Sequence, residues 1–430
     1  YIGSMPGIKA LVAAVFGWIG SIPGAFVGGI ALGVIEQLAK QYISDQLSNA
    51  IVFLVLILVL LIRPTGLFGR KISEKVWVES MKQTKKKQLI DNIITYGLVV
   101  AFWAVIQILT ASGNLSNQLK GLLVPLCVYV ILAVSLNLVV GISGELSLGH
   151  AGFMCVGAFS GAFFSKLMAE TIASNTLRLA IAIVIGAAVA AVFGILIGIP
   201  VLRLRGDYLA IVTLAFGEII KNVLNVLYVG SDANGIHVAM SKKALNLLDE
   251  GQVIIEGAKG IAKTPRASNF NIGIVLVLIT LFIVLNLIHS RTGRAIMSIR
   301  DNRIAAESVG INITKYKLLA FTVSASLAGG GGGLYAHNYA SLAGGTFDYN
   351  MSILILVYVV LGGIGNIRGS MIAAVVLTAL PELLRSFSNY RMLIYAIVLI
   401  AMMLFTSAPG AIAFRERLVE NFRGHRNKEV

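Results

Sequence analysis

Residues 119–141 read Leu-Lys-Gly-Leu-Leu-Val-Pro-Leu-Cys-Val-Tyr-Val-Ile-Leu-Ala-Val-Ser-Leu-Asn-Leu-Val-Val-Gly. Lys120 is the only charged side chain in this stretch. A helix needs about 20 predominantly apolar residues to cross the hydrocarbon core of a bilayer. The stretch therefore predicts a membrane-crossing helix, and it decides the class of the fold.

Comparable apolar stretches recur along the chain in two groups. The first group lies at about 5–20, 24–39 and 50–62. The second group lies at about 92–111, 119–141, 148–168, 178–201, 207–228, 270–289, 317–340, 350–366, 370–384 and 392–408. We therefore predict an all-α polytopic transmembrane helix bundle, with about three helices in the N-terminal segment and about ten in the rest.

The composition agrees with this class. The chain has 430 residues, of which 57% are hydrophobic and 13% are charged, whereas roughly a quarter of an ordinary soluble domain is charged. The formal net charge of +15 would allow nucleic-acid binding, but no polar domain is available to carry it, so we expect no nucleic-acid partner. Cys127 and Cys155 lie inside apolar runs, so we expect neither a disulfide framework nor a metal site, and no cofactor.

The basic residues predict the orientation of the bundle, because cytoplasmic loops are enriched in Lys and Arg. Four basic regions fall on one face if the second group has ten crossings, and that face should be cytoplasmic. These regions are residues 82–87, Arg203 with Arg205, residues 291–317 and residues 415–428. One loop disagrees, because residues 230–268 also carry Lys and Arg and the same count places them outside.

An internal repeat links the two ends of the chain. Leu11 aligns with Leu356, and the same offset of 345 holds without a gap to Arg70 and Arg415. Gly17 then meets Gly362, and both segments read G-x-I-G-x-I-x-G before two apolar stretches. The first part of the chain is therefore predicted to be the C-terminal end of a second, related membrane subunit.

Three motifs carry a family resemblance: residues 144–153 (GELSLGHAGF), residues 202–218 (LRLRGDYLAIVTLAFGE), and residues 291–294 (RTGR) with residues 304–310 (IAAESVG). Through them residues 81–430 resemble the LivM-type permeases of branched-chain amino-acid ABC importers. Residues 1–76 resemble the C-terminal end of the LivH-type partner permeases, through residues 17–24 and 63–66 (RPTG).

The resemblance implies a division of the chain into four parts. Residues 1–76 would be a LivH-type fragment, 77–91 a cytoplasmic junction, 92–408 the permease domain and 409–430 a basic cytoplasmic tail. The chain begins with Tyr1 rather than Met, so we expect it to start in the middle of something longer. Met81 resembles an original start, and residues 77–80 are interpreted as translated intergenic sequence. Whether residues 1–80 are functional or inert stays open.

One loop is a candidate for contact with an ATPase. Residues 304–310 contain the small-residue pattern A-A-x-x-x-G of the coupling loop of ABC permeases, with Ile304 where that pattern has Glu. Small residues allow two helices to approach closely, and basic side chains can pair with acids on a partner. The candidate coupling residues are Arg294, Arg300, Arg303, Ala305, Ala306 and Gly310. The alternative is an ordinary basic cytoplasmic loop.

Four ionisable residues lie in or beside the predicted spans: Glu145, His150, Asp207 and Glu218. An isolated charge inside a membrane costs on the order of 3 kcal/mol, so these side chains should face the bundle interior or an interface. For Glu145 and Asp207 we favour capping or interfacial roles. Glu218 is the better candidate for the translocation path, with an interhelical hydrogen bond as the alternative.

The glycine run 329–333 is not a phosphate-binding loop, because no Lys follows it. Close helix packing is its predicted role. No Walker-type loop occurs anywhere in the sequence, so we expect that the chain is not an enzyme and does not hydrolyse ATP.

The resemblance implies a multi-pass permease of the bacterial inner membrane that imports leucine, isoleucine or valine. Its implied partners are a LivH-type permease, two cytoplasmic ABC ATPases and an extracytoplasmic amino-acid-binding protein. Two alternatives stay open: a related permease for urea, amides or another amino acid, and an ion-coupled secondary transporter.

Overall fold

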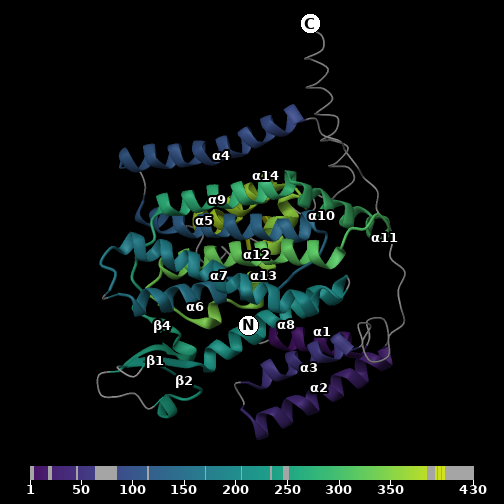
Figure 1. Ribbon diagram of the computed structural model, residues 1–430. Coiled ribbons are helices and arrows are strands. Elements are labelled where there is room, and N and C mark those ends of the chain that lie inside the picture. The colour runs from purple at the N-terminus through teal and green to yellow at the C-terminus, as the bar shows by residue number, and fades with distance from the viewer. Residues whose placement is uncertain are drawn as a thin grey trace.

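The fold is taken from a computed structural model of the chain (Figure 1). The structure describes residues 4–17, 22–44, 47–62, 85–113, 116–169, 171–204, 206–232, 235–245, 251–384, 393–394, 396–398 and 400–401. The predicted tail at 409–430 and most of the predicted last span at 392–408 lie outside these residues, as do residues 77–84 of the predicted junction.

Helices dominate the described chain. They are α1 Ser4–Gly17, α2 Ile22–Tyr42, α3 Ser48–Ile62, α4 Lys85–Ala111, α5 Asn117–Asn137, α6 His150–Leu167, α7 Asn175–Val201, α8 Asp207–Val226, α9 Phe270–His289, α10 Arg291–Asp301, α11 Arg303–Ser308, α12 Ile313–Ala336, α13 Tyr349–Gly362 and α14 Ile367–Leu383. Seven segments among the described residues are long and apolar enough to cross a membrane. The predicted all-α polytopic bundle is confirmed.

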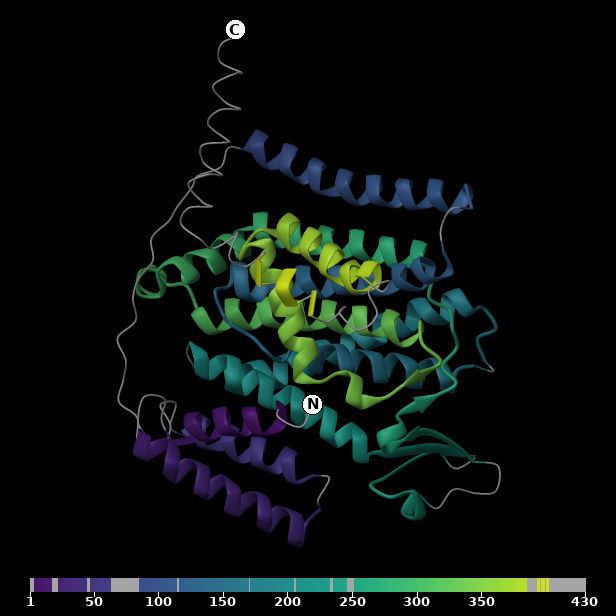
Figure 2. The same ribbon diagram turned by 180° about the vertical axis from the view of Figure 1, so that it is seen from behind.

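Most long helices lie side by side along one common direction, with α6, α7 and α12 in the middle of the stack (Figures 1 and 2). Glycines allow these three helices to touch backbone to backbone. A Cβ atom built on Gly157 would lie 2.2 Å from the carbonyl oxygen of Gly329, and one on Gly186 would lie 2.7 Å from that of Gly157. The predicted role of the glycine run in close helix packing is therefore confirmed.

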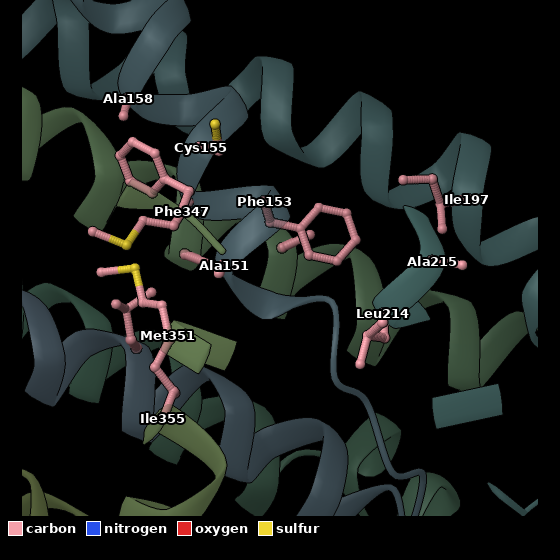
Figure 3. Packing of buried hydrophobic residues seen from close by; sticks show 14 of the residues in the cluster. Ala151, Phe153, Cys155, Ala158, Ile197, Leu214, Ala215, Phe347, Met351 and Ile355 are labelled. Atoms are coloured by element: carbon pink, nitrogen blue, oxygen red, sulfur yellow. The ribbon is translucent and has the colours of Figure 1, made fainter. Parts of the chain in front are cut away.

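Apolar side chains fill the space around this glycine contact. The rings of Phe153 on α6 and Phe321 on α12 meet edge to face, with centroids 5.4 Å apart. Figure 3 shows Phe153, Leu214 and Ile197 on one side of this cluster, and Phe347 with Met351 on the other. The core therefore joins α6, α7, α8 and α12 to the start of α13.

A small β structure caps one end of the bundle. Strands β1 Tyr228–Asp232, β2 Gly235–Ala239 and β3 Gln252–Glu256 form an antiparallel sheet in the order β2-β1-β3. Strands β4 Ile261–Ala262 and β5 Ser341–Leu342 pair separately. Residues 230–268 were expected to form a loop, and the strands correct this expectation. A hairpin signal was present in the sequence, because Asn-Gly at 234–235 stands between two stretches that carry β-branched residues.

The sheet and the candidate coupling loop lie at opposite ends of the bundle. Helix α9 starts after the sheet and ends directly before α10, and its 20 residues span about 30 Å. Helix α12 returns from the α11 end to the strand β5. Figures 1 and 2 show the same separation of β1 and β2 from α10 and α11.

The internal repeat appears in the structure with the same offset of 345. Helix α1 Ser4–Gly17 corresponds to α13 Tyr349–Gly362, and α2 starts at Ile22 where α14 starts at Ile367. Both hairpins cross at paired glycines, because a Cβ on Gly17 would lie 1.9 Å from the Gly24 oxygen, and one on Gly369 would lie 1.7 Å from the Gly362 oxygen. The α1–α3 unit packs on the rest of the chain mainly through α3 against α8.

Candidate functional site

Helices α10 and α11 build the candidate coupling surface between α9 and α12. Ser290 caps α10 by accepting a hydrogen bond from the Gly293 amide at 3.0 Å, and Asn302 caps α11 by accepting one from the Ala305 amide at 3.0 Å. Asn302 is extended, with φ −153° and ψ 102°, so it ends α10 and redirects the chain into α11. The two caps fix a short helix pair beyond the ends of the bundle.

One face of α11 is bound to the protein and the other is open. Ala306 is buried with Ile299 and Ile313. Ile304 is 79% exposed and Val309 is 74% exposed, and Ala305 lies between them on the exposed side. Gly310 follows with φ +86° and no other atom within 4 Å of an added Cβ. An exposed apolar face of this kind can receive another protein.

The three candidate arginines have different surroundings. The Arg300 guanidinium donates from Nη1 to the Gly141 oxygen at 2.8 Å and contacts the Asp301 carboxylate at 2.9 and 3.0 Å. Arg294 donates to the His289 oxygen at 3.3 Å. Arg303 is half-exposed at the start of α11. Arg300 thus ties α10 to the rest of the chain.

The carbonyl that Arg300 binds belongs to a π-helical turn, Leu138–Ile142, that ends α5. Beside it, Asn137 donates to the Ser370 hydroxyl at 2.8 Å and accepts from the Gly365 amide at 2.8 Å. Arg300 thus links α10 to the π-helical turn at the end of α5. Asn137, directly before that turn, links α5 to the start of α14. Gly141, Asn137 and Ser370 were not among the predicted site residues, because none of them carries a charge.

Glu145 stands in the extended stretch between α5 and α6, where its carboxylate pairs with the Lys317 ammonium on α12. Both side chains are largely buried, at 12% and 11% exposure. The pair holds this connection against the first half of α12. It lies on the same side of the bundle as α10 and fits the predicted interfacial role.

His150 is the first residue of α6 and is buried. Its Nε2 atom lies 2.8 Å from the Ser135 hydroxyl on α5, and that hydroxyl donates to the Leu132 oxygen at 3.0 Å. The Ser324 hydroxyl on α12 donates to the backbone carbonyl oxygen of Ser135 at 2.6 Å. The three residues form a small polar contact that joins α5, α6 and α12.

Glu218 lies in the middle of α8 and is 1% exposed. Its Oε1 atom accepts a hydrogen bond from the Tyr349 amide at 3.2 Å, and its Oε2 atom lies 2.5 Å from the Lys221 ammonium. The carboxylate therefore sits at the N-terminus of α13, where a negative charge is favourable. This is the geometry of the interhelical hydrogen bond that the sequence analysis kept as the alternative.

Asp207 is exposed in the first turn of α8, beside Gly206 with φ +58°. The N-cap residue is Gly206 and, among the described residues, no side chain caps α8 by a hydrogen bond, so Asp207 contributes a negative charge in the first turn, where a carboxylate is stabilising. The ionisable candidates are not brought into one cluster: Glu145 pairs with Lys317, His150 contacts Ser135, and Glu218 contacts Tyr349 and Lys221. Within the described ranges, no group of three or more His, Cys, Asp or Glu side chains could hold a metal ion.

A cavity of about 120 Å³ lies between α4, α5, α9 and α14. Apolar side chains alone form its walls, among them Phe102, Cys127 and Val375. None of the candidate polar residues borders it. The cavity therefore belongs to the packing around α4, not to the polar contacts described above.

Comparisons with known proteins identify the family. Residues 118–406 match the family described as "Branched-chain amino acid transport system / permease component". The chain is 36% identical over 288 residues to the high-affinity branched-chain amino acid transport system permease protein LivM of Salmonella typhimurium, which covers 64% of this chain and 66% of that protein.

A second relative matches the N-terminal segment. Over 76 residues the chain is 54% identical to the corresponding permease protein LivH of Escherichia coli (strain K12), covering 18% of this chain and 25% of LivH. A more distant relative, the fructose import permease protein FruG of Bifidobacterium longum, is 30% identical over 136 residues, 30% of this chain and 40% of that protein.

The chain thus spans just under two thirds of the length of its LivM relatives, and no solved structure matches it. The predicted resemblance to LivM-type permeases in the C-terminal part and to LivH-type permeases in the N-terminal part is confirmed. The family match extends over most of the helices that build the bundle. The chain belongs to the permease component family of branched-chain amino acid transport systems.

Proposed function

We propose that this chain is a membrane-embedded permease subunit of an ABC importer that carries leucine, isoleucine or valine into the cell. The observation that carries the proposal is the exposed α10–α11 surface in a chain of this family, held at the end of the bundle opposite the sheet. The permease is a multi-pass protein of the bacterial inner membrane, with α10 and α11 on the cytoplasmic side. It is not an enzyme, and ATP hydrolysis belongs to its partners.

The proposed partners are a LivH-type permease, two cytoplasmic ATPases and an extracytoplasmic binding protein. The ATPase would receive the open face of α11, with Ile304 and Val309 in a cleft and Arg303 beside an acidic residue. The small side chains of Ala305 and Ala306 would let the partner and α10 approach α11 closely. Gly310, with its positive φ, forms the turn that leads into α12. At the other end of the loop, Arg294 donates a hydrogen bond to the His289 carbonyl oxygen.

Transmission would run through Arg300. When ATP closes the ATPases, α11 is pulled with them, and the Arg300 contact to Gly141 pulls the end of α5. Asn137 passes the displacement to Ser370 on α14. Packed elements that have two arrangements transmit such a shift as a rigid unit. The bundle then alternates between outward and inward access.

The choice of amino acid depends on more than this bundle, because a relative over 30% of the chain is named for fructose import. We place the selection of leucine, isoleucine or valine largely in the binding protein. An aliphatic substrate suits a core that is lined mainly by apolar side chains and glycines. A permease for another small solute is the alternative outcome of the transport experiment.

The test is uptake of radiolabelled leucine into proteoliposomes that hold this chain, its partner permease, both ATPases and the binding protein. The informative variants are Ile304→Asp and Val309→Asp, since both side chains are mostly exposed, so we expect their replacement to leave the fold intact. We expect each to reduce ATP-driven uptake and ATPase co-purification by about tenfold or more, as for residues at the centre of an interface.

Val238→Asp is the matched control, since Val238 is also an exposed apolar residue, 64% exposed, at the opposite end of the bundle. It should leave ATPase co-purification unchanged. Leucine uptake that follows a proton gradient without ATP, and that survives Ile304→Asp, would contradict the proposal and favour an ion-coupled transporter. Uptake of urea, an amide or another amino acid in place of leucine would keep the importer and change its substrate.

A further inference from the structure

The two copies of the internal repeat differ in what covers them. In the C-terminal copy, α14 packs on α5 through a row of side chains one helical turn apart. Ser370 and Ala374 in that row are completely buried, and Met371 beside them is 3% exposed. Asn137 of α5 donates to the Ser370 hydroxyl at 2.8 Å. The row is thus the contact by which α14 holds α5.

The same row in the N-terminal copy is only partly covered: Ala25 and Gly29 are half-buried, and a Cβ built on Gly29 would lie 3.8 Å from the Ala13 Cβ of α1. With the offset of 345, Ala25, Gly29 and Gly33 of α2 correspond to Ser370, Ala374 and Thr378 of α14. Gly33 is exposed, and a Cβ built on it would meet no atom within 4 Å. Phe26, the counterpart of the buried Met371, is 70% exposed. Helix α2 lies at the outer edge of the molecule, away from α8 (Figures 1 and 2).

Helix α1 continues this open surface. In the C-terminal copy, the Ser352 hydroxyl of α13 accepts a hydrogen bond from the Ala151 amide at 3.1 Å, and Ile355 is completely buried. Their counterparts on α1 are Gly7 and Ala10, and both are exposed. An added Cβ on Gly7 would meet nothing within 4 Å. We call this surface the open face of the α1–α2 hairpin. Its exposed members are Gly7, Ala10, Phe26 and Gly33, and the half-buried Ala25 and Gly29 lie in the same row of α2.

Contact with lipid alone does not account for the small residues. A lipid-facing helix needs apolar side chains of any size, whereas small residues every fourth position allow a second helix to approach closely. In the C-terminal copy, helix α5 covers the equivalent row of α14. The repeat therefore indicates both the kind of occupant and its orientation, because α14 and α5 run antiparallel, with Asn137 beside Ser370 and Cys127 near Val375 and Val376.

We propose that the open face of the α1–α2 hairpin binds a transmembrane helix of the α5 type, supplied by a LivH-type permease chain. The N-terminal segment would then be a docking module that complements a partner chain and joins it to this one through α3 and α8. The inference rests on the proposed function only in naming a permease as the partner. The helix contact itself is a property of the hairpin.

The probe is a synthetic peptide of residues 117–142 of this chain, with Cys127→Ala and a fluorescent acceptor at its N-terminus. The full chain is placed in lipid nanodiscs with a donor on a Tyr42→Cys variant. Tyr42 is 77% exposed at the end of α2, and the native Cys127 and Cys155 are buried, so the donor reacts at position 42. Antiparallel docking places the acceptor near the donor.

We expect saturable energy transfer that a peptide of scrambled sequence does not give. Gly33→Leu places a bulky side chain where an added Cβ meets no other atom within 4 Å. It should weaken binding about tenfold, within the range of transmembrane helix contacts. Gly97→Leu is the matched control, since Gly97 is an equally open glycine on the exposed helix α4. Its binding curve should equal that of the parent chain.

Equal transfer with the scrambled peptide, or an unchanged binding curve for Gly33→Leu, would overturn the proposal. The measurement uses neither ATP nor an amino acid, so its failure leaves the uptake experiment untouched. Conversely, loss of ATP-driven uptake does not change the expected energy transfer. The two proposals therefore fail separately.

Discussion

Replacement of Glu218 tests whether this buried carboxylate ties two helices together or carries protons. Glu218→Ala removes the acceptor of the Tyr349 amide and leaves the Lys221 ammonium without its partner at 2.5 Å. The Lys221 side chain is only 12% exposed. Breaking one side of such a buried pair costs about 3–5 kcal/mol, so we expect the free energy of unfolding to fall by that amount.

The second arm of the experiment removes the cation. Lys221→Met leaves the buried Glu218 carboxylate with the Tyr349 amide on Oε1 but without the cation beside Oε2, so the cost should again be about 3–5 kcal/mol. The double variant Glu218→Ala/Lys221→Met has no unpaired charge, and its cost should fall short of the sum of the two single costs by about 2 kcal/mol, within the range for residues in contact. Denaturant-induced unfolding in mixed micelles gives all three values.

The uptake assay supplies the other half of the test. Glu218→Gln keeps an oxygen for the Tyr349 amide but cannot exchange a proton, so ATP-driven leucine uptake should persist. Strictly additive unfolding costs would refute the view that Glu218 and Lys221 act as a pair. Loss of uptake in a stably folded Glu218→Gln protein would place Glu218 in the translocation chemistry instead.

Three further variants probe contacts that the structure makes explicit. Gly157→Ala forces a Cβ to within 2.2 Å of the Gly329 oxygen, so thermal unfolding should show a loss of about 1–3 kcal/mol, whereas Gly97→Ala, in open space, should be neutral or stabilising. Arg300→Ala removes the bond to the Gly141 oxygen, so ATP-driven uptake should fall several-fold while the ATPases still co-purify. Gly260→Ala places a Cβ 1.9 Å from the Leu342 oxygen at φ +68°, so limited proteolysis should cut the sheet region faster and stimulation by the binding protein should weaken.

The sequence predicted the helices well because the signal was strong and uniform. Residues 119–141 and their counterparts are long apolar runs, and the described helices α5 to α9 and α12 to α14 follow them within a few residues. Helices α10 and α11 lie in the basic region 291–317, which the sequence indicated only as a loop. The glycine run was also interpreted correctly, since five consecutive glycines in an apolar helix leave few roles besides close contact. Helix α4 begins at Lys85, inside the predicted junction, because Lys and Gln are good helix formers.

The polar contacts were harder to predict than the helices. Charge drew attention to Glu218 and His150, and the i,i+3 spacing on α8 marks Lys221 as a partner of Glu218. Their other partners are a backbone amide and a serine hydroxyl, which no periodic pattern marks. Arg300 was placed with the coupling residues, yet its binding to Gly141 depends on a π turn that sequence patterns do not show. Pairing between distant elements is decided by the tertiary structure, so spacing along the chain cannot reveal it.

The repeat gives the clearest reason why sequence and structure were both needed. Sequence alone showed that residues 11–70 and 356–415 correspond, and it treated the two copies as equivalent. The structure shows that one copy buries Ser370, Met371 and Ala374, whereas in the other, within the described chain, Phe26 and Gly33 are exposed and Ala25 and Gly29 are half-buried. Small residues spaced for helix contact gain nothing from lipid alone. We therefore expect the N-terminal copy to bind a helix from a partner. The surface that this helix must bury is the surface that is exposed on α2 and buried at the equivalent positions of α14.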